Sequence, residues 1–198
     1  MKCLLIKNAD VYAPQPLGIV DLLIINDKIA KIGQQLAAPQ GLDCQILDAQ
    51  KRKVVPGYVD QHVHIIGGGG ESGPYSRTPE INLSELTKVG ITTVVGVLGT
   101  DGTSRHNESL LAKARGLTHE GITAYMLTGS YEIPLHNMTG DVRRDIILIN
   151  ECLGIGEVAL SDHRSSQPTR EELEKVLTQL AWAVCFPARP ALCSSTWV

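Results

Sequence analysis

Two histidines separated by one residue, His62 and His64, are the strongest candidates for chemistry in this sequence. They end an apolar stretch that starts at Pro56, and a glycine run at 67–70 follows them. In a β-strand, residues i and i+2 project to the same face, so both imidazoles can reach one divalent ion. A His-x-His tripeptide alone is weak, because exposed or hydrogen-bonded histidines give the same pattern. The strand context favours a metal site, with Asp60 orienting the strand or a histidine ring.

Strands and helices that alternate along the chain would position this pair. The first 55 residues predict a small β module with short strands at 4–6, 18–25, 28–32, 46–47 and 54–55, and with its prolines in the connections. From residue 56 onward the pattern predicts strands at 58–64, 91–98, 122–127 and 158–160. It predicts helices at 83–88, 104–119, 141–152 and 169–182, the last opening with a capping box of Thr169 and Glu172. Such alternation is typical of parallel strands covered by helices.

Each predicted strand of this second part ends in residues that are capable of chemistry. They are His62 and His64, then Thr100 and Asp101, then Thr128 and Tyr131, then Asp162, His163 and Arg164. In a (β/α) barrel, the active site is assembled from the C-terminal ends of the strands. We therefore predict an α/β fold with half of a catalytic barrel, rather than a plain doubly wound sheet.

Composition and charge exclude several classes of function. The formal net charge of -3 at pH 7 argues against a nucleic-acid or membrane-surface role driven by positive charge. No apolar run approaches a transmembrane span, and the N-terminal apolar stretch is too short for a secretory signal. The five cysteines are odd in number and lack a framework spacing, which predicts reduced thiols. We expect a cytoplasmic protein.

Four stretches of sequence carry a family resemblance. They are PGYVDQHVHIIGGGGE at 56–71, VGVLGTD at 95–101, MLTGSY at 126–131 and SDHRS at 161–165. In order and spacing, from about residue 3 to about residue 181, they resemble the isoaspartyl (β-aspartyl) dipeptidases of the amidohydrolase superfamily. The superfamily at large shares only the His-x-His part, so the glycine run with Glu71 and the Ser-Asp-His-Arg stretch indicate this branch.

The resemblance implies a fold and a cofactor. The fold would be the N-terminal part of a TIM-like (β/α)8 metal-dependent hydrolase barrel, incomplete here, preceded by a small β-sandwich module. A complete site would hold two Zn²⁺ ions, with His62 and His64 on the more buried one. Two such ions turn bound water into hydroxide near neutral pH and stabilise a developing oxyanion.

The resemblance also implies roles at the matching substrate-facing positions. Glu71 would hold the α-amino group of a small β-aspartyl dipeptide, and Thr100 would line the substrate site. The hydroxyl of Tyr131 would polarise the scissile carbonyl, which makes Tyr131 and Glu71 the predicted catalytic residues. Arg164 would pair with a substrate carboxylate, for which its planar fork of donors is suited. Ordinary capping or packing is the alternative for Thr100 and Tyr131, and a local ion pair with Asp162 is the alternative for Arg164.

One position departs from the family pattern. The bridge between the two metals is usually a carboxylated lysine on the fourth barrel strand, and the matching residue here is Glu157. Glutamate also presents two carboxylate oxygens, on a shorter stem, so it could bridge metals if its strand lies closer. The alternative is that Glu157 is a surface residue and the bridge is lost.

The residues from 181 to 198 resemble neither a barrel strand nor a cap. The family barrel needs eight strands, two further histidine ligands and an aspartate base, whereas about four strands are predicted here. Codons permitted for this tail, re-read from their third base, include a glycine-rich loop and an apolar strand ending in His. We therefore expect a one-base frameshift after codon 181, and domains at 1–55, 56–180 and 181–198.

Three functions remain open from the sequence. The first is zinc-dependent hydrolysis of β-aspartyl dipeptides, impaired by truncation. The second is another amidohydrolase activity on amide C–N bonds, against which Glu71 and Arg164 argue. The third is an inactive, aggregation-prone fragment that binds at most one metal ion through His62 and His64. Members of the family are typically homo-oligomers, and the sequence does not predict the oligomeric state of this chain.

Overall fold

The structure is a computed structural model that describes residues 2–185 and 192–196. The chain divides into two compact units, Met1–Gly57 and Tyr58–Val198. The first unit is built of strands only, and the second alternates strands and helices along its sequence.

The first unit is one mixed five-stranded sheet. Its strands are β1 (Cys3–Tyr12), β2 (Pro16–Ile25), β3 (Lys28–Gly33), β4 (Cys44–Asp48) and β5 (Lys53–Val54). β2 runs antiparallel to β1 and β3, whereas β4 and β5 both pair parallel with β1. The predicted strand positions are confirmed, although β1 is longer than expected. The described residues of this unit form a single sheet, so the second layer of the expected sandwich is not among them.

Two predictions for this unit are wrong. Pro16 begins β2 instead of lying in a connection, which is possible because a strand's first residue needs no backbone N–H donor. Cys3 and Cys44 form a disulfide, although five free thiols were expected. The pairing of β1 with β4 places these two residues directly opposite each other, with Cα atoms 4.5 Å apart. Residues that are 41 apart in sequence give no spacing signal for such a pair.

A buried carboxylate in β2 links this strand to β1 and to the segment that follows β3. Asp21 is 4% exposed and accepts hydrogen bonds from Lys7 Nζ at 2.6 Å and from the amides of Asn8 and Leu36, each at 2.9 Å. The hydrogen bond from Lys7 is the main cause that holds the pKa of Asp21 below its ordinary value of 3.8, against the opposing effect of burial.

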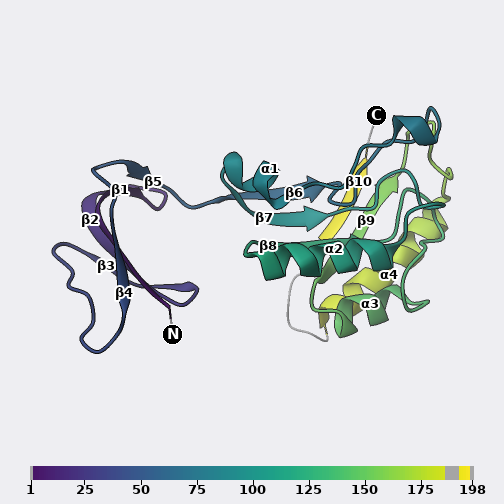
Figure 1. The fold of residues 1–198 in the computed structure, drawn as a ribbon. Coiled ribbons are helices and arrows are strands. Elements are labelled where there is room, and N and C mark those ends of the chain that lie inside the picture. The colour runs from purple at the N-terminus through teal and green to yellow at the C-terminus, as the bar shows by residue number, and fades with distance from the viewer. Residues whose placement is uncertain (1, 186–191, 197–198) are drawn as a thin grey trace. The chain divides into compact units, whose positions relative to one another are not determined.

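The second unit contains a parallel sheet covered by helices (Figure 1). Its strands are β6 (Tyr58–Val63), β7 (Ile91–Gly96), β8 (Thr123–Thr128), β9 (Cys152–Ala159) and β10 (Leu192–Thr196), in the spatial order β10-β9-β8-β7-β6. Its helices are η1 (Pro74–Ser76), α1 (Leu83–Lys88), α2 (Asn107–Glu120), α3 (Val142–Leu148) and α4 (Arg170–Cys185). The predicted half-barrel of parallel strands and its alternating helices are confirmed, as is the capping box of Thr169 and Glu172.

Two boundaries differ from the expected ones. The helix predicted over 141–152 begins after its N-cap, Asp141, and ends at Leu148, because the backbone at Ile149 is extended and a turn at Ile149–Cys152 leads into β9. β9 begins at Cys152, six residues before the predicted 158. Glycines at 154 and 156 hide this strand in the sequence, since glycine is poorly represented in strand interiors.

The tail also differs from the sequence-based expectation. Helix α4 continues to Cys185, and Leu192–Thr196 form a fifth strand that pairs parallel with β9. The expectation of no strand beyond residue 181 is therefore wrong. The origin of the tail in a shifted reading frame stays a prediction, since a strand at this place does not test it.

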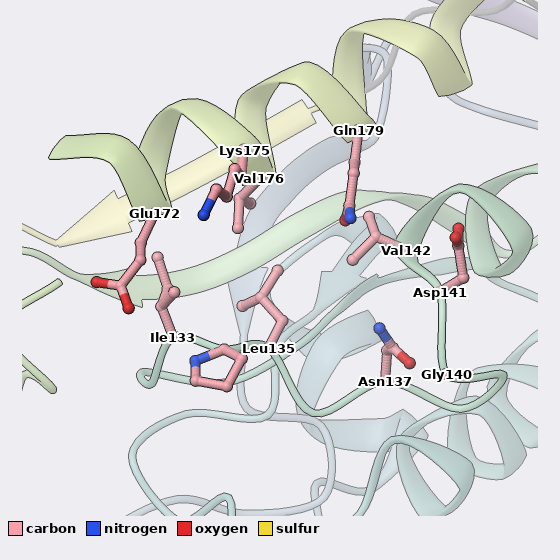
Figure 2. A pocket seen from close by; sticks show the side chains of 11 residues that line it. Ile133, Leu135, Asn137, Gly140, Asp141, Val142, Glu172, Lys175, Val176 and Gln179 are labelled. Carbon is pink, nitrogen blue, oxygen red and sulfur yellow. The ribbon is translucent and has the colours of Figure 1, made fainter. Parts of the chain in front are cut away.

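Helices α3 and α4 pack on each other, and a groove of about 340 Å³ lies between α4 and the loop before α3 (Figure 2). Val176 and Gln179 of α4 face Leu135 and Val142 across it. None of the predicted site residues lines this groove.

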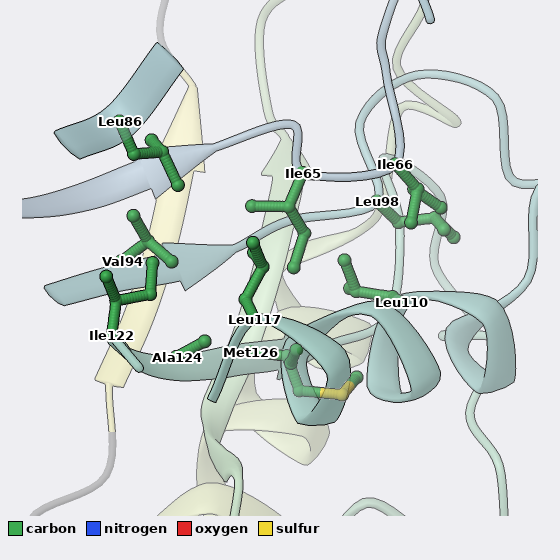
Figure 3. Close-up of a cluster of buried hydrophobic side chains, with 11 residues drawn as sticks. Ile65, Ile66, Leu86, Val94, Leu98, Leu110, Leu117, Ile122, Ala124 and Met126 are labelled. Atoms are coloured by element: carbon green, nitrogen blue, oxygen red, sulfur yellow. The ribbon is translucent and has the colours of Figure 1, made fainter. Parts of the chain in front are cut away.

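The main core of the second unit fixes the segment that follows the histidine pair. Ile65 and Ile66, directly after His64, are 0% and 7% exposed and pack with Leu110 and Leu117 of α2 and with strand side chains (Figure 3). Burial of an isoleucine or leucine side chain stabilises the fold by about 1.5–3 kcal/mol. The histidines therefore stand immediately before an anchored segment, which limits how far they can move.

A second buried carboxylate organises the connection between β8 and α3. Asp145 is 0% exposed and accepts hydrogen bonds from the Thr128 hydroxyl at 2.6 Å and from the Met138 amide at 3.0 Å. It also accepts from the amide and the hydroxyl of Thr139, at 3.0 and 2.6 Å. Thr128 ends β8, so Asp145 ties the strand end to the loop that contains Tyr131.

Candidate active site

Three side chains converge at the C-terminal end of the parallel sheet. His62 Nε2 lies 3.2 Å from Glu157 Oε2, and His64 Nε2 lies 3.9 Å from the same oxygen. The potential ligand atoms of the three residues all lie within 4.8 Å of one another. Ligands at about 2.0–2.2 Å from one Zn²⁺ stand about 3–4 Å apart, so small side-chain movements would close this set around an ion.

Local structure explains how the two histidines come together. His62 is in β6 and His64 lies one residue beyond it, with the two rings 5.5 Å apart in a T-shaped arrangement. Asp60 Oδ1 accepts a hydrogen bond from the His62 amide at 3.2 Å, a contact with the backbone of this strand and not with a histidine ring. Gly99 packs against His64 so closely that a Cβ there would lie 2.8 Å from the ring, at a φ of +83 that disfavours other residues.

The chemistry of this donor set suits a divalent transition metal. Two imidazoles and one carboxylate are common ligands of zinc. Burial is the main cause that lowers the pKa of His64 below 6.5, and it is opposed by the charge of Glu157. A neutral imidazole is the form that binds metal. The residues present therefore fit a metal ion.

Glu157 is buried within β9 and has different partners on its two oxygens. It is 3% exposed, so the alternative that it is a surface residue is wrong. Oε2 faces the histidines, and Oε1 accepts a hydrogen bond from the Tyr131 hydroxyl at 3.0 Å. Tyr131 is itself buried, and the guanidinium carbon of Arg164 lies 5.2 Å from its ring centroid, a cation–π distance.

A second group of polar side chains surrounds Glu71. Its Oε1 accepts hydrogen bonds from the Thr100 hydroxyl and from Arg164 Nη1, each at 3.0 Å. Arg164 also donates through Nε and Nη2 to both oxygens of Asp162, so the alternative of a local ion pair is observed. Asp162 is 2% exposed, and its carboxylate fixes the plane of the guanidinium.

The charges of this group stabilise one another. Hydrogen bonds from Arg164 hold the pKa of Asp162 far below its usual range, and the same contact raises the pKa of the Arg164 guanidinium. The pKa of Glu71 is below 4.5 because its own amide and the Thr100 hydroxyl donate to the carboxylate, with the charge of Arg164 adding to the effect. Glu71 and Arg164 therefore both remain charged at neutral pH.

All seven predicted site residues thus lie in two neighbouring groups. His62, His64, Glu157 and Tyr131 form one, and Glu71, Thr100 and Arg164 form the other, with the Arg164–Tyr131 contact between them. Sequence reasoning missed Arg105, a buried cation whose only sequence signal is its place beside the strand-end residues Thr100 and Asp101.

Comparison with solved structures shows which proteins share this arrangement of elements. Two structures of β-aspartyl dipeptidase from Fervidobacterium islandicum AW-1 are 40% identical to this chain and cover 98% of it, with TM-scores of 0.92 and 0.93. The chain is a relative of the β-aspartyl dipeptidases. One of these structures is in complex with the dipeptide β-Asp-Leu. This chain spans about half the length of the two enzymes, 50% and 53% of their chains.

The chain also matches shorter stretches of two curated enzymes. A dihydroorotase of Staphylococcus aureus MRSA252 is 38% identical over 90 residues, which are 46% of this chain and 20% of that enzyme. An imidazolonepropionase of Photorhabdus laumondii is 28% identical over 120 residues, 59% of this chain and 29% of that enzyme. No protein-family model matches the sequence. Among the described residues, no helix has the length and apolar character needed to span a membrane.

Proposed function

We propose that this chain carries the metal-binding and substrate-binding half of a zinc-dependent β-aspartyl dipeptidase. The observation that carries the proposal is the meeting of His62, His64 and Glu157 within 4.8 Å, beside the Glu71–Arg164 pair. The similarity to β-aspartyl dipeptidases over 98% of the chain supports the same substrate class.

The charged pair suits a β-aspartyl substrate. In such a dipeptide the side-chain carboxyl forms the peptide bond, so the aspartyl unit keeps a free α-amino and a free α-carboxylate group. Glu71 would accept hydrogen bonds from the ammonium group, with Thr100 beside it. Arg164 would receive the carboxylate through donors not engaged by Asp162 or Glu71. Ordinary α-dipeptides offer these two charges at a different separation.

The residues around Glu157 would serve the chemical step. Bound divalent ions supply a hydroxide nucleophile near neutral pH and stabilise negative charge on the scissile carbonyl oxygen. His62, His64 and Glu157 would hold the metal, with the Glu157 carboxylate taking the place of the carboxylated lysine that usually bridges two ions. The Tyr131 hydroxyl would then donate to the scissile carbonyl.

Hydrolysis of β-Asp-Leu by zinc-reconstituted protein, with α-Asp-Leu as the matched substrate, tests this function. We expect turnover of the β-linked peptide only, at a rate lowered by the truncation, and its loss in Glu157→Gln but not in the exposed control Glu120→Gln. Hydrolysis of dihydroorotate instead would favour the second reading, an amidohydrolase acting on another C–N bond. No cleavage of any of these by correctly folded, zinc-loaded protein would contradict the proposal.

A non-catalytic metal-binding chain is the second candidate. It is favoured by the fact that the described residues offer one three-ligand group for a metal. Metal analysis separates the two, because two ions per chain support the dipeptidase and one ion supports the binding chain.

We further propose that the protein acts in the cytoplasm. Because glutathione keeps cytosolic thiols reduced, Cys3 and Cys44 would then be thiols in the cell. Thiol trapping in freshly lysed cells, with an alkylating agent of known mass, measures this. If Cys3 and Cys44 do not react with the alkylating agent because they form a disulfide, the compartment is oxidising and the assignment is contradicted.

A further inference from the structure

Arg105 is a buried cation in the connection between β7 and α2, two residues before the helix begins, and it lies outside the two groups of site residues. It is 5% exposed, and its guanidinium donates to two backbone carbonyls of the glycine run. Nη1 donates to Gly69 O at 3.0 Å and Nη2 donates to Gly68 O at 2.9 Å. These bonds join the connection after β7 to the connection after β6, between residues that are 36 and 37 apart in sequence.

The surroundings of Arg105 make this a costly arrangement. The nearest carboxylate is that of Asp101, whose Oδ2 lies 3.7 Å from Nη1 and which also bonds to the amides of Thr103 and Ser104. Among the described residues, Arg105 Nε is buried without a hydrogen-bond partner. Burial of a charge with incomplete partners costs free energy. The hydrogen bonds to the Gly68 and Gly69 carbonyls offset part of this cost and hold the glycine run in place.

The two glycines that Arg105 holds lie between the metal-ligand candidates and Glu71. A Cβ at Gly68 would be 3.3 Å from His64 Cγ, so the backbone of Gly68 packs directly on the ring. A Cβ at Gly69 would be 3.8 Å from Glu71 Oε2. Gly68 O also accepts from the Thr78 amide at 2.9 Å, so Arg105 and Thr78 hold this peptide from two sides.

A run of four glycines has no side chains to define its own path. Glycine loses more conformational freedom on folding than any other residue, so the 67–70 segment must be fixed by its neighbours. An arginine can donate to two adjacent carbonyls at once, whereas a lysine offers one compact charge.

We propose that Arg105 is a positioning residue for the active site. It fixes the glycine run so that Gly68 supports the His64 ring and Glu71 stays directed at Thr100 and Arg164. The part of this proposal that concerns substrate rests on the proposed dipeptidase function, whereas the part that concerns the loop does not.

Hydrogen exchange on the whole chain, without substrate, tests the loop. We expect amides of residues 67–79 to exchange about tenfold faster in Arg105→Met, as local opening becomes easier, and less so in Arg105→Lys. Amides of α2 and β8 should be unchanged, and Arg115→Met, which removes a surface pair with Glu151, serves as the control. Unchanged protection of residues 67–79 in both Arg105 variants, with native secondary structure, would overturn the proposal.

Kinetics of the zinc-loaded protein test the effect on substrate. A purely structural role would lower the active fraction and hence kcat alone. Positioning of Glu71 would instead raise KM for β-Asp-Leu about tenfold in Arg105→Lys with kcat little changed, and the increase would largely vanish in a Glu71→Gln background. A fall in kcat alone would overturn this part. If the wild-type protein has no turnover, the proposed function fails and the exchange measurement still decides the role of Arg105.

Discussion

The Tyr131 hydroxyl donates a hydrogen bond to Glu157 Oε1 at 3.0 Å, on the side of the carboxylate opposite to the histidines. Both side chains are buried, at 6% and 3% exposure, so water competes little for this contact. The bond holds the carboxylate in the orientation that directs Oε2 toward His62 and His64. Tyr131 thus acts on the candidate metal site before any substrate is present.

Tyr131→Phe should therefore weaken metal binding as well as catalysis. Groups that orient a metal ligand typically contribute about 10–100-fold to metal affinity, so we expect a rise in the zinc Kd of about tenfold. Competition with a chromophoric chelator measures it without any substrate. The matched control is Tyr125→Phe in β8, the strand that precedes the loop containing Tyr131. This substitution should leave the zinc Kd unchanged. Equal affinities for wild type and Tyr131→Phe would show that the hydroxyl does not position Glu157.

Asp145→Asn should destabilise the second unit. The amide NH₂ of asparagine cannot accept from the donors that surround Asp145, which leaves buried donors unpaired at about 1–3 kcal/mol each. We expect a loss of about 2–4 kcal/mol in urea unfolding. The control is Asp141→Asn, four residues earlier, because asparagine is as good an N-cap as aspartate. Equal losses in the two variants would contradict the role of Asp145.

The stability of the first unit should depend on the charge of Asp21. The pKa of this carboxyl is lowered in the folded state, mainly by Lys7, so its contribution is complete above the ordinary value of 3.8 and is lost as pH falls below it. Asp21→Asn should unfold more easily than wild type at pH 7, and the difference should shrink as the pH drops below 3.8. Hydrogen exchange of β1 and β2 amides reports it, with exposed Asp43→Asn as the control. If the difference in protection between wild type and Asp21→Asn is the same at pH 7 and pH 3, the charge of Asp21 does not contribute to the stability of this unit.

Reduction of the Cys3–Cys44 disulfide should destabilise the same unit. The bond joins residues 41 apart, and closure of a loop of that length constrains the unfolded chain by about 4 kcal/mol. Unfolding of the first unit should occur at lower denaturant concentration with a reductant than without it. Cys44→Ser should behave like reduced wild type and lose the response, whereas Cys185→Ser, at a free and exposed cysteine, should keep it. If the unfolding midpoint of the wild-type first unit is the same with and without reductant, the disulfide does not stabilise this unit.

Periodicity and spacing predict much of this fold because burial follows them. Helix α1 was expected over 83–88 and occupies Leu83–Lys88, and β6, β7 and β8 lie within two residues of their expected bounds. The histidine pair was also accessible from sequence, since the i, i+2 geometry is local. The positions of Glu71, Thr100 and Arg164 followed from a family resemblance, not from the physics of the residues.

Long-range relationships escaped the sequence. The contact of Arg105 with the glycine run and the disulfide of Cys3 depend on which segments become neighbours in the fold. The predicted strand at 158–160 was shorter than β9 because β9 contains two glycines. The neighbouring strands nevertheless hold these glycines in an extended backbone. In each case tertiary contacts, rather than local preference, decided the structure.

Strand β1 has a consequence for the order in which the chain can fold. It pairs with β2, β4 and β5, so every strand that the structure places against it is complete by residue 54. During translation, all of these partners are made before Tyr58 opens the parallel sheet. The strands of the first unit can therefore pair as soon as they leave the ribosome. The sheet of β6 to β10 can form only later, because helices separate its strands in the sequence.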